Sequence, residues 1–231
     1  KILGTAHNDK GIGTLSEKTL HAVLKNYYEP DENKHEVAID GYYADIFNDS
    51  GIIEIQTRQL NKLRDKLAVF LEEYHVTVVY PCAYNKWISW IDPESGDISA
   101  KRKSPRHYTE YDAFFELYKI KNLLKHPNLS VHLVLMDIEE YKLLNGWNYT
   151  RKRGATRYDR VPLGVRKIVE LDRPEDYMQF VPIDLEDEFI VKDFAKAAMV
   201  HEDTARLSLN ILNYLGVVRR VGKKGNAYVY S

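Results

Sequence analysis

The sequence predicts an α/β protein in which helices flank a mixed sheet, followed by a smaller C-terminal domain. Three observations predict it. Residues 43–57 alternate around a turn as in a β-hairpin, residues 58–75 have helical apolar spacing before the apolar run "VTVVYP", and residues 190–231 have the pattern of two helices followed by two strands. We expect the boundary near residue 180, which gives domains 1–180 and 181–231.

The composition limits the classes of protein to which the chain can belong. A chain of 231 residues can bury a core without disulfides, and Cys82, its single cysteine, cannot form an intramolecular one. No apolar run is long enough to span a membrane, and residues 1–11 lack the apolar core of a signal peptide, so we expect a cytoplasmic protein with no membrane partner. Because the net charge is -1, any nucleic-acid contact must come from local basic clusters.

The first predicted helix covers residues 14–28. Thr14 and Glu17 have the spacing of a capping box, which gives Glu17 a structural role. The expected apolar stripe of this helix is Leu20, Val23, Leu24 and Tyr27. The strand "HEVAID" follows.

The segment "YADIFNDSGIIEIQT" predicts a hairpin with an acidic pair on one face. If Phe47 faces Ile52, then Asp45 lies directly opposite Glu54, with their Cβ atoms roughly 5 Å apart. Strand parity points Gln56 to the same face. A divalent metal held by carboxylate oxygens would compensate the two like charges, and a solvated sheet face that tolerates the pair is the alternative.

The next helix, over residues 58–75, starts directly after the carboxylate strand. Its first turns therefore lie near Glu54, so Lys62 and Lys66 are candidates for a catalytic lysine, with a solvated charged face as the alternative. Its apolar stripe is Leu60, Leu63, Leu67, Phe70, Leu71 and Tyr74. The apolar run "VTVVYP" then predicts a central strand of the sheet.

Two basic clusters follow, the first in a hairpin and loop expected over residues 85–106 and the second in "YTRKRGATRYDR". Cations interleaved with aromatic residues suit phosphate contact and base stacking, whereas an exposed loop is the alternative for the second cluster. The first cluster is Lys101, Arg102, Lys103 and Arg106, and the second is Arg151, Lys152, Arg153, Arg157 and Arg160.

Residues 171–188 are acidic and interrupted by prolines, as in a linker or docking segment. The rest of the chain resembles a winged helix-turn-helix domain, with a short helix, a longer helix that Gly216 ends, and a hairpin that carries Lys223 and Lys224 at its turn. The longer helix offers Arg206 among acidic neighbours, so nucleic-acid binding and protein docking both stay open.

Asp45, the turn and the following "EIQ" resemble the active-site signature of the PD-(D/E)XK nuclease superfamily, whose fold is called restriction-endonuclease-like. The sequence departs from that signature twice, with Ala44 in place of proline and Gln56 in place of lysine. Some members of the superfamily resemble this chain in having E-x-Q, and others supply the lysine from the following helix. The order of helix, strands, hairpin, helix and strand is as the resemblance requires.

The resemblance implies hydrolysis of phosphodiester bonds in DNA or RNA, with Mg²⁺ or Mn²⁺ as the cofactor. Gln56 would orient the attacking water, and Lys62 or Lys66 would steady the developing charge. The implied metal ligands are Asp45, Glu54 and the carbonyl of Ile55, joined by Glu17 of the first helix with His21 one turn later.

Two other functions fit the same residues. A non-catalytic protein could use the fold to grip nucleic acid or a protein partner, and a transcriptional regulator could sense a ligand with its N-terminal domain. The sequence leaves DNA versus RNA, the oligomeric state and a homodimer open.

Overall fold

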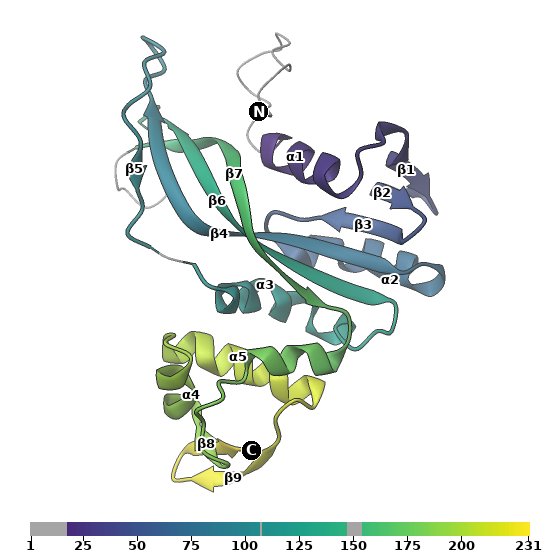
Figure 1. The fold of residues 1–231 in the computed structure, drawn as a ribbon, viewed down its shortest axis with the longest axis vertical. Helices are drawn as coiled ribbons and strands as arrows, with labels where there is room; N and C mark the ends of the chain where they lie inside the picture. The colour runs from purple at the N-terminus through teal and green to yellow at the C-terminus, as the bar shows by residue number, and fades with distance from the viewer. Residues whose placement is uncertain (1–17, 107, 147–153) are drawn as a thin grey trace.

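The computed structural model describes residues 18–106, 108–146 and 154–231 (Figure 1). These residues form a mixed α/β body, with a seven-stranded sheet flanked by helices and a three-stranded sheet near the C-terminus. The sequence candidates Glu17, Arg151, Lys152 and Arg153, and the capping residue Thr14, lie outside the described residues.

Runs of strands and runs of helices follow one another along the chain. The strands of the large sheet are β1 (His35–Ile39), β2 (Tyr42–Asn48), β3 (Gly51–Ile55), β4 (Val76–Ile91), β5 (Arg102–Lys103), β6 (Leu129–Leu143) and β7 (Thr156–Leu171). The α-helices of this part are α1 (Lys18–Tyr28), α2 (Arg64–Glu73) and α3 (Phe114–Leu117). The 3₁₀ helices are η1 (Glu32–Lys34), η2 (Leu60–Leu63), η3 (Glu110–Ala113), η4 (Tyr118–Leu123) and η5 (Pro174–Phe180). The C-terminal elements are β8 (Phe189–Ile190), α4 (Val191–Ala197), α5 (Glu202–Leu215), β9 (Arg220–Lys224) and β10 (Ala227–Tyr230).

The large sheet has the strand order β1-β2-β3-β4-β6-β7, and β5 pairs with β4. The first three strands are antiparallel, whereas β4 runs parallel to both β3 and β6. The helical segment η2–α2 makes the crossover from β3 to β4 that parallel pairing requires. The predicted hairpin register is confirmed, because Phe47 pairs with Ile52.

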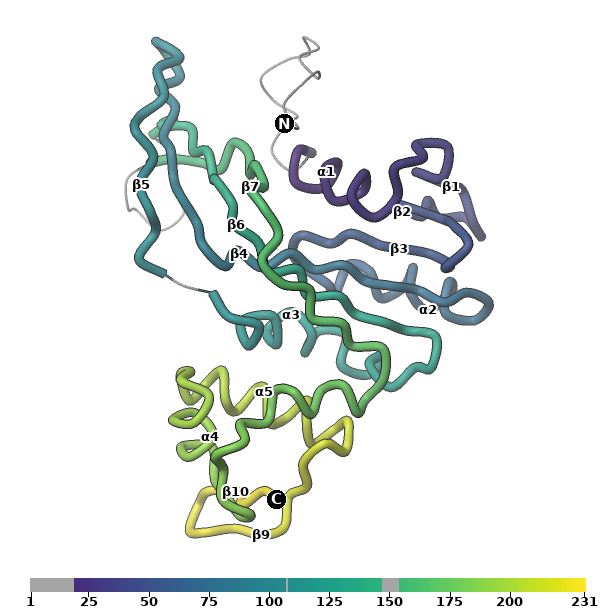
Figure 2. Tube along the Cα trace, viewed as in Figure 1, coloured from purple at the N-terminus to yellow at the C-terminus, as the bar shows by residue number. Residues whose placement is uncertain are grey.

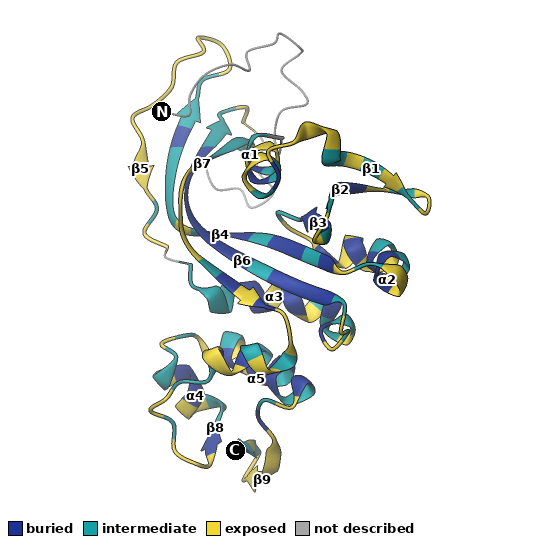
Figure 3. Ribbon diagram, turned by 45° about the vertical axis from the view of Figure 1, so that its right-hand side comes forward, coloured by how far each residue is buried: buried dark blue, intermediate teal, exposed yellow. Residues whose placement is uncertain are grey.

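Helices cover both faces of the sheet and define two apolar cores (Figure 3). On one face, Leu20 and Leu24 of α1 are fully buried against residues of β2, β3 and β4. The predicted stripe of α1 is partly wrong, since Val23 and Tyr27 are 45% and 56% exposed. On the other face, η2 and α2 bury the apolar stripe predicted for them, except that Tyr74 is half-buried.

The strands β4, β6 and β7 continue past the central sheet and form an arm, which we define as residues 85–91, 137–143 and 156–162 together with β5 (Figure 1). The sequence predicts a strand at "VTVVYP" and a separate hairpin from residue 85, but β4 is one strand, because its pairing with β6 resumes after a bulge between Ala83 and Asn85. The exposed-loop alternative for the second basic cluster is also wrong from Thr156 onward, where β7 begins.

The first part of the acidic segment after β7 is part of the core, so the interpretation of residues 171–188 as a linker throughout is wrong, although residues 183, 184 and 186–188 are exposed. Tyr177 and Phe180 of η5 are each 1% exposed, and the backbone carbonyl of Phe180 accepts a hydrogen bond from Tyr111 Oη at 3.0 Å. The same apolar cluster continues into Phe194 of α4 and Leu209 of α5. In Figure 2 the C-terminal elements lie directly below α3. Because residues on both sides of the predicted boundary near residue 180 share one core, the structure does not favour two pieces that fold separately.

The described residues contain no helix that is both long and apolar enough to cross a membrane.

Candidate active site

The acidic pair lies where β2 and β3 stop pairing with each other. Their backbone pairing runs from Asn48–Gly51 to Ile46–Ile53. Beyond it, Glu54 Oε1 accepts a hydrogen bond from the backbone N–H of Asp45 at 3.2 Å, and Asp45 Oδ2 accepts one from the N–H of Ile55 at 2.7 Å. Each carboxylate thus replaces a ladder hydrogen bond of the opposite strand, which fixes both side chains without metal.

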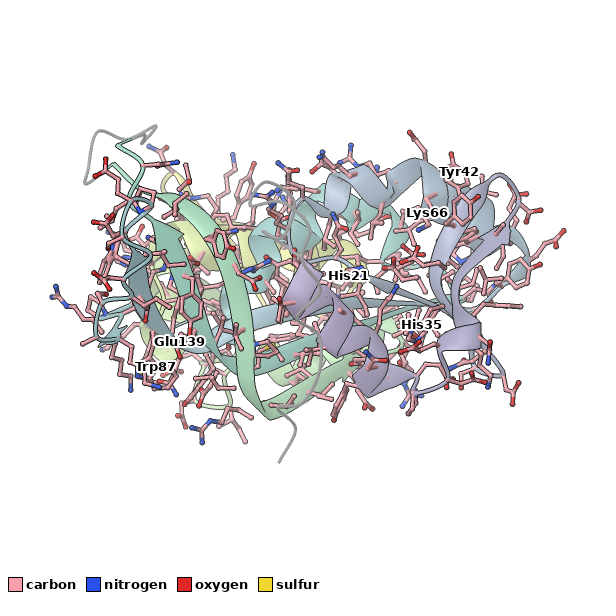
Figure 4. The ribbon with its side chains drawn as sticks, turned by 90° about the horizontal axis from the view of Figure 1, so that it is seen from above. His21, His35, Tyr42, Lys66, Trp87 and Glu139 are labelled. Carbon is pink, nitrogen blue, oxygen red and sulfur yellow. The ribbon has the colours of Figure 1, made fainter. Side chains whose placement is uncertain are left out.

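Two helices on opposite faces of the sheet complete the site (Figure 4). His21 of α1 contacts Asp45, with 3.1 Å between Nε2 and Oδ2. Lys66 of α2 contacts Glu54, with 2.6 Å between Nζ and Oε2, and the Lys66 side chain is 17% exposed. His21, Asp45, Glu54 and Lys66 line one pocket of about 340 Å³.

Burial and charge separate the pKa values of the two carboxyls. Burial raises the pKa of Asp45, but the hydrogen bond and charge of His21, with the N–H of Ile55 and the charge of Lys66, lower it below its usual value overall. Burial and the charge of Asp45 raise the pKa of Glu54 to about 7, against the opposing effect of Lys66. Glu54 is therefore poised to lose a proton near neutral pH when a cation approaches.

Gln56 and Lys62 also line the pocket, but the surroundings of their side chains differ. Gln56 Nε2 donates to the backbone carbonyls of Arg58 and Gln59, at 2.5 Å and 3.4 Å, so this amide braces the turn after β3. The same turn holds Gln59 in the left-handed region, at a φ of 58°. Lys62 lines the pocket but is exposed. The water-orienting role of Gln56 stays a prediction.

The donor set around Asp45 and Glu54 is small. Within the part of the chain that the structure describes, no group of three or more His, Cys, Asp and Glu side chains could hold a metal ion. Two carboxylates nevertheless suffice for Mg²⁺, which keeps several waters and takes its remaining ligands from substrate phosphates. The carbonyl of Ile55 was also a predicted ligand, and its residue is 2% exposed at the pocket wall.

The first basic cluster lies on and beside the arm. Lys101 pairs with Glu139 at 3.7 Å, and Arg106 pairs with Asp112 at 3.2 Å. Arg102 and Lys103 form β5, both exposed, opposite Ile88 and Trp87 of β4. Figure 4 places Trp87 and Glu139 together at the end of the molecule away from Tyr42. Lys101, Arg102 and Lys103 are therefore at the far end of the sheet from the hairpin, whereas Arg106 lies beside Asp112.

The described part of the second basic cluster lies closer to the site. Arg157 and Arg160 of β7 line a second pocket, which shares Thr57 and Arg58 with the carboxylate pocket. Arg157 Nε lies 3.4 Å from Glu140 Oε2. Three other residues of this pocket, Lys86, Tyr108 and Glu140, were missed in the sequence, because they come from separate elements and no short motif joins them.

The C-terminal candidates differ in their surroundings. Arg206 Nη1 is 2.7 Å from Asp203 Oδ1, so the first turn of α5 neutralises this cation locally. Lys223 and Lys224 end β9 at the hairpin turn, as predicted, and both are exposed. Lys223 Nζ lies 5.0 Å from the centroid of the Tyr228 ring.

The pKa of Glu54 predicts a pH-dependent effect on stability in the absence of divalent cations. Folding raises this pKa from 4.5 to about 7, so stability from the protonated carboxyl is fully present below pH 4.5 and is lost as the pH rises through about 7. Glu54→Gln removes that loss. We expect its free energy of unfolding to exceed that of the wild type by on the order of 1 kcal/mol at pH 8 and by less at pH 5.

Urea unfolding in EDTA at both pH values measures this effect. Glu72→Gln, which changes an exposed carboxylate of α2, is the matched control and should leave stability unchanged at both. A Glu54→Gln effect that is equal at pH 5 and pH 8 would contradict the raised pKa.

The comparisons with known proteins give a family without a described activity. Residues 18–172 match the family model described as "Domain of unknown function (DUF8091)", and because the match spans more than half of the chain, the chain belongs to this family. The chain is 29% identical over 227 residues to an "Uncharacterized protein" of Treponema pallidum (strain Nichols), covering 95% of this chain and 86% of that protein. No solved structure matches the chain. The carboxylate pocket lies wholly within the matched segment.

Proposed function

We propose that this member of the DUF8091 family is a metal-dependent nuclease that hydrolyses phosphodiester bonds of nucleic acid on a restriction-endonuclease-like scaffold of the PD-(D/E)XK type. One observation carries the proposal. Asp45 and Glu54, from neighbouring strands, share a pocket with Lys66 of the following helix, whose Nζ lies 2.6 Å from Glu54 Oε2. Lys66 supplies the positive charge that Gln56 cannot, as in members whose lysine comes from the helix.

The order of elements supports the same scaffold. A helix, three antiparallel strands, a second helix and a strand parallel to β3 follow one another from α1 to β4. The resemblance requires this order, with the acidic pair on the second and third strands. Asp45 is on β2 and Glu54 is on β3.

The chemistry of the donors fits Mg²⁺ or Mn²⁺. Asp45 and Glu54 would hold the ion by carboxylate oxygens, with the carbonyl of Ile55. The raised pKa of Glu54 supports this, because burial, the largest cause, and the like charge of Asp45 together outweigh the charge and hydrogen bond of Lys66, so a further positive charge would stabilise the ionised carboxylate. When bound, such an ion polarises the phosphate and offsets its negative charge.

The side chains of the protein position and stabilise the reacting groups. His21 holds Asp45 in place by the contact between Nε2 and Oδ2. Lys66 holds Glu54 and brings a positive charge to the pocket where the phosphate gains negative charge during the reaction. Water adds to phosphorus and releases one proton to solvent, the bond from phosphorus to the leaving oxygen breaks, and that oxygen takes up a proton from solvent.

For the C-terminal segment from β8 to β10, we propose a winged-helix fold. We favour protein docking as its role over the recognition of DNA. The exposed side chains at the start of α5 are Glu202, Asp203 and the already paired Arg206. Further along, Asn210 and Tyr214 of α5 bond to η4. An α-helix that enters the major groove needs a free, cationic or polar face, and α5 offers an acidic one.

The test is cleavage of a panel of nucleic acids, single- and double-stranded DNA and RNA, with Mg²⁺, Mn²⁺ or EDTA. We expect the full chain to cut at least one substrate class with metal and none with EDTA. An Asp45→Asn protein prepared in parallel controls for a contaminating nuclease. Binding without cleavage, in every metal, would favour a non-catalytic nucleic-acid-binding protein instead.

A further inference from the structure

A second pocket, of about 240 Å³, adjoins the carboxylate pocket and shares Thr57 and Arg58 with it. Its other walls come from residues 80–86 of β4, the segment 108–113 that contains η3, and residues of β6 and β7. We call it the cationic pocket, because Arg58, Lys86, Arg157 and Arg160 all line it.

Positive charge exceeds negative charge around this pocket. Its two carboxylates are Asp112 and Glu140. Glu140 is 4% exposed and faces three cations, at 3.9 Å from Lys86, 3.4 Å from Arg157 and 3.5 Å from Lys142.

Asp112 is also engaged, because it accepts hydrogen bonds from the backbone of Thr109 and from the guanidinium of Arg106. Glu140, the carboxylate beside Lys86 and Arg157, therefore carries one negative charge against three positive charges.

Lys86 is a largely buried cation of this pocket on which other positive charges act. Its side chain is 18% exposed, and its Nζ lies 5.7 Å from the centroid of the Tyr108 ring. Burial lowers the pKa of the Lys86 ammonium, Glu140 raises it, and the charges of Lys142, Arg157 and Arg106 lower it further. An anion in the pocket would relieve this repulsion.

The ring of Tyr108 also holds the guanidinium of Arg106, whose Cζ lies 4.3 Å from the ring centroid. Tyr108 thus fixes two cations at the rim, which favours a small ligand with several oxygen atoms over an apolar one.

We propose that the cationic pocket binds a phosphate group of the substrate adjacent to the phosphate at Asp45 and Glu54. This rests on the proposed nuclease function, because the pockets share one wall, the turn after β3, and a nucleic-acid strand carries phosphates at regular intervals. The phosphate is either an internal phosphodiester of a strand that continues past the site or a terminal phosphomonoester of a strand that ends there. Arg157 and Lys86 are its main contacts.

The experiment measures binding in EDTA, where no cleavage occurs. Fluorescence anisotropy compares labelled oligonucleotides that carry a 5′-phosphate, a 3′-phosphate or only hydroxyl ends, with the full chain and with Arg157→Gln and Lys86→Gln. Lys142→Gln is the matched control, since Lys142 pairs with Glu140 but does not line the pocket. Far-UV circular dichroism and thermal melting verify that every variant is folded.

We expect Arg157→Gln and Lys86→Gln to weaken binding about 10-fold and Lys142→Gln less than about 2-fold. A loss confined to one phosphorylated end assigns a terminal phosphomonoester, and an equal loss for all ends assigns an internal phosphodiester. Wild-type affinity in both pocket variants, or an equal loss in Lys142→Gln, overturns the proposal.

The two proposals fail in different ways. If the pocket variants bind oligonucleotide as the wild type does while the wild type still cuts it, the cationic pocket is refuted and the nuclease stands. The other outcome is that the wild type cuts no substrate, while pyrophosphate displaces bound oligonucleotide from the wild type and not from Arg157→Gln. In that case the nuclease is refuted and the cationic pocket stands as an anion site.

Discussion

Replacing Lys66 with methionine is expected to slow metal-dependent cleavage by about 100- to 1,000-fold. The loss of one well-placed electrostatic contact to a developing charge is typically this large. Lys66 is the lysine of α2 that touches the acidic pair, and its side chain is 17% exposed, so its charge acts in a partly desolvated pocket. Methionine keeps most of the length of the side chain and removes the ammonium.

Lys62→Met is the matched control for this prediction. Lys62 lines the same pocket and lies one turn earlier, but it is exposed. We expect it to change the cleavage rate by less than about 3-fold, because solvent screens its charge. Single-turnover rates at saturating protein separate a change in the rate of cleavage from a change in substrate binding. Equal losses in the two variants would refute the assignment of the catalytic lysine to Lys66.

Replacing Phe194 with alanine is expected to destabilise the whole chain by about 3–5 kcal/mol. Phe194 of α4 is fully buried, and its ring lies 6.2 Å from the ring of Tyr111, which precedes α3. Because one apolar cluster joins α4 and α5 to η5, α3 and the central strands, a cavity at Phe194 weakens both parts at once.

The tryptophans make this prediction measurable. Trp87, Trp90 and Trp147 all precede the C-terminal segment, so their fluorescence reports unfolding of the first part of the chain alone. We expect Phe194→Ala to move the tryptophan transition and the far-UV circular dichroism transition together to lower urea. Met199→Ala, at a side chain that is 90% exposed, should move neither. An unchanged tryptophan transition in Phe194→Ala would mean that the C-terminal segment folds on its own.

The hairpin and its acidic pair could be predicted from the sequence because their information is local. Turn residues, β-branched flanks and strand parity fix the pairing of Phe47 with Ile52, and that register brings Asp45 to Glu54. The choice between Lys62 and Lys66 could not be made, since it depends on where the helix begins. The chain forms the 3₁₀ helix η2 before α2, and this places Lys66 against Glu54.

Features that depend on long-range packing could not be predicted. The polar composition of residues 171–188 indicates a linker, yet Tyr177 and Phe180 are buried by elements more than 60 residues away in the chain, such as Tyr111. The continuity of β4 depends on its pairing with β6, which resumes after a bulge. The cationic pocket joins side chains from the turn after β3, from the segment 108–113 and from β4, β6 and β7, so no single segment carries its pattern.

Binding of Mn²⁺, followed by electron paramagnetic resonance of the free ion, tests the central claim most directly, because it needs neither the substrate nor the reaction conditions. The claim is that Asp45 and Glu54 form a divalent-cation site. We expect the full chain to bind Mn²⁺ at one site at pH 8, and Asp45→Asn to weaken that binding at least about 10-fold, with Asp65→Asn, on the exposed side of α2, as the control. If Asp45→Asn binds Mn²⁺ as tightly as the wild type, the acidic pair is not the metal site and the nuclease mechanism fails.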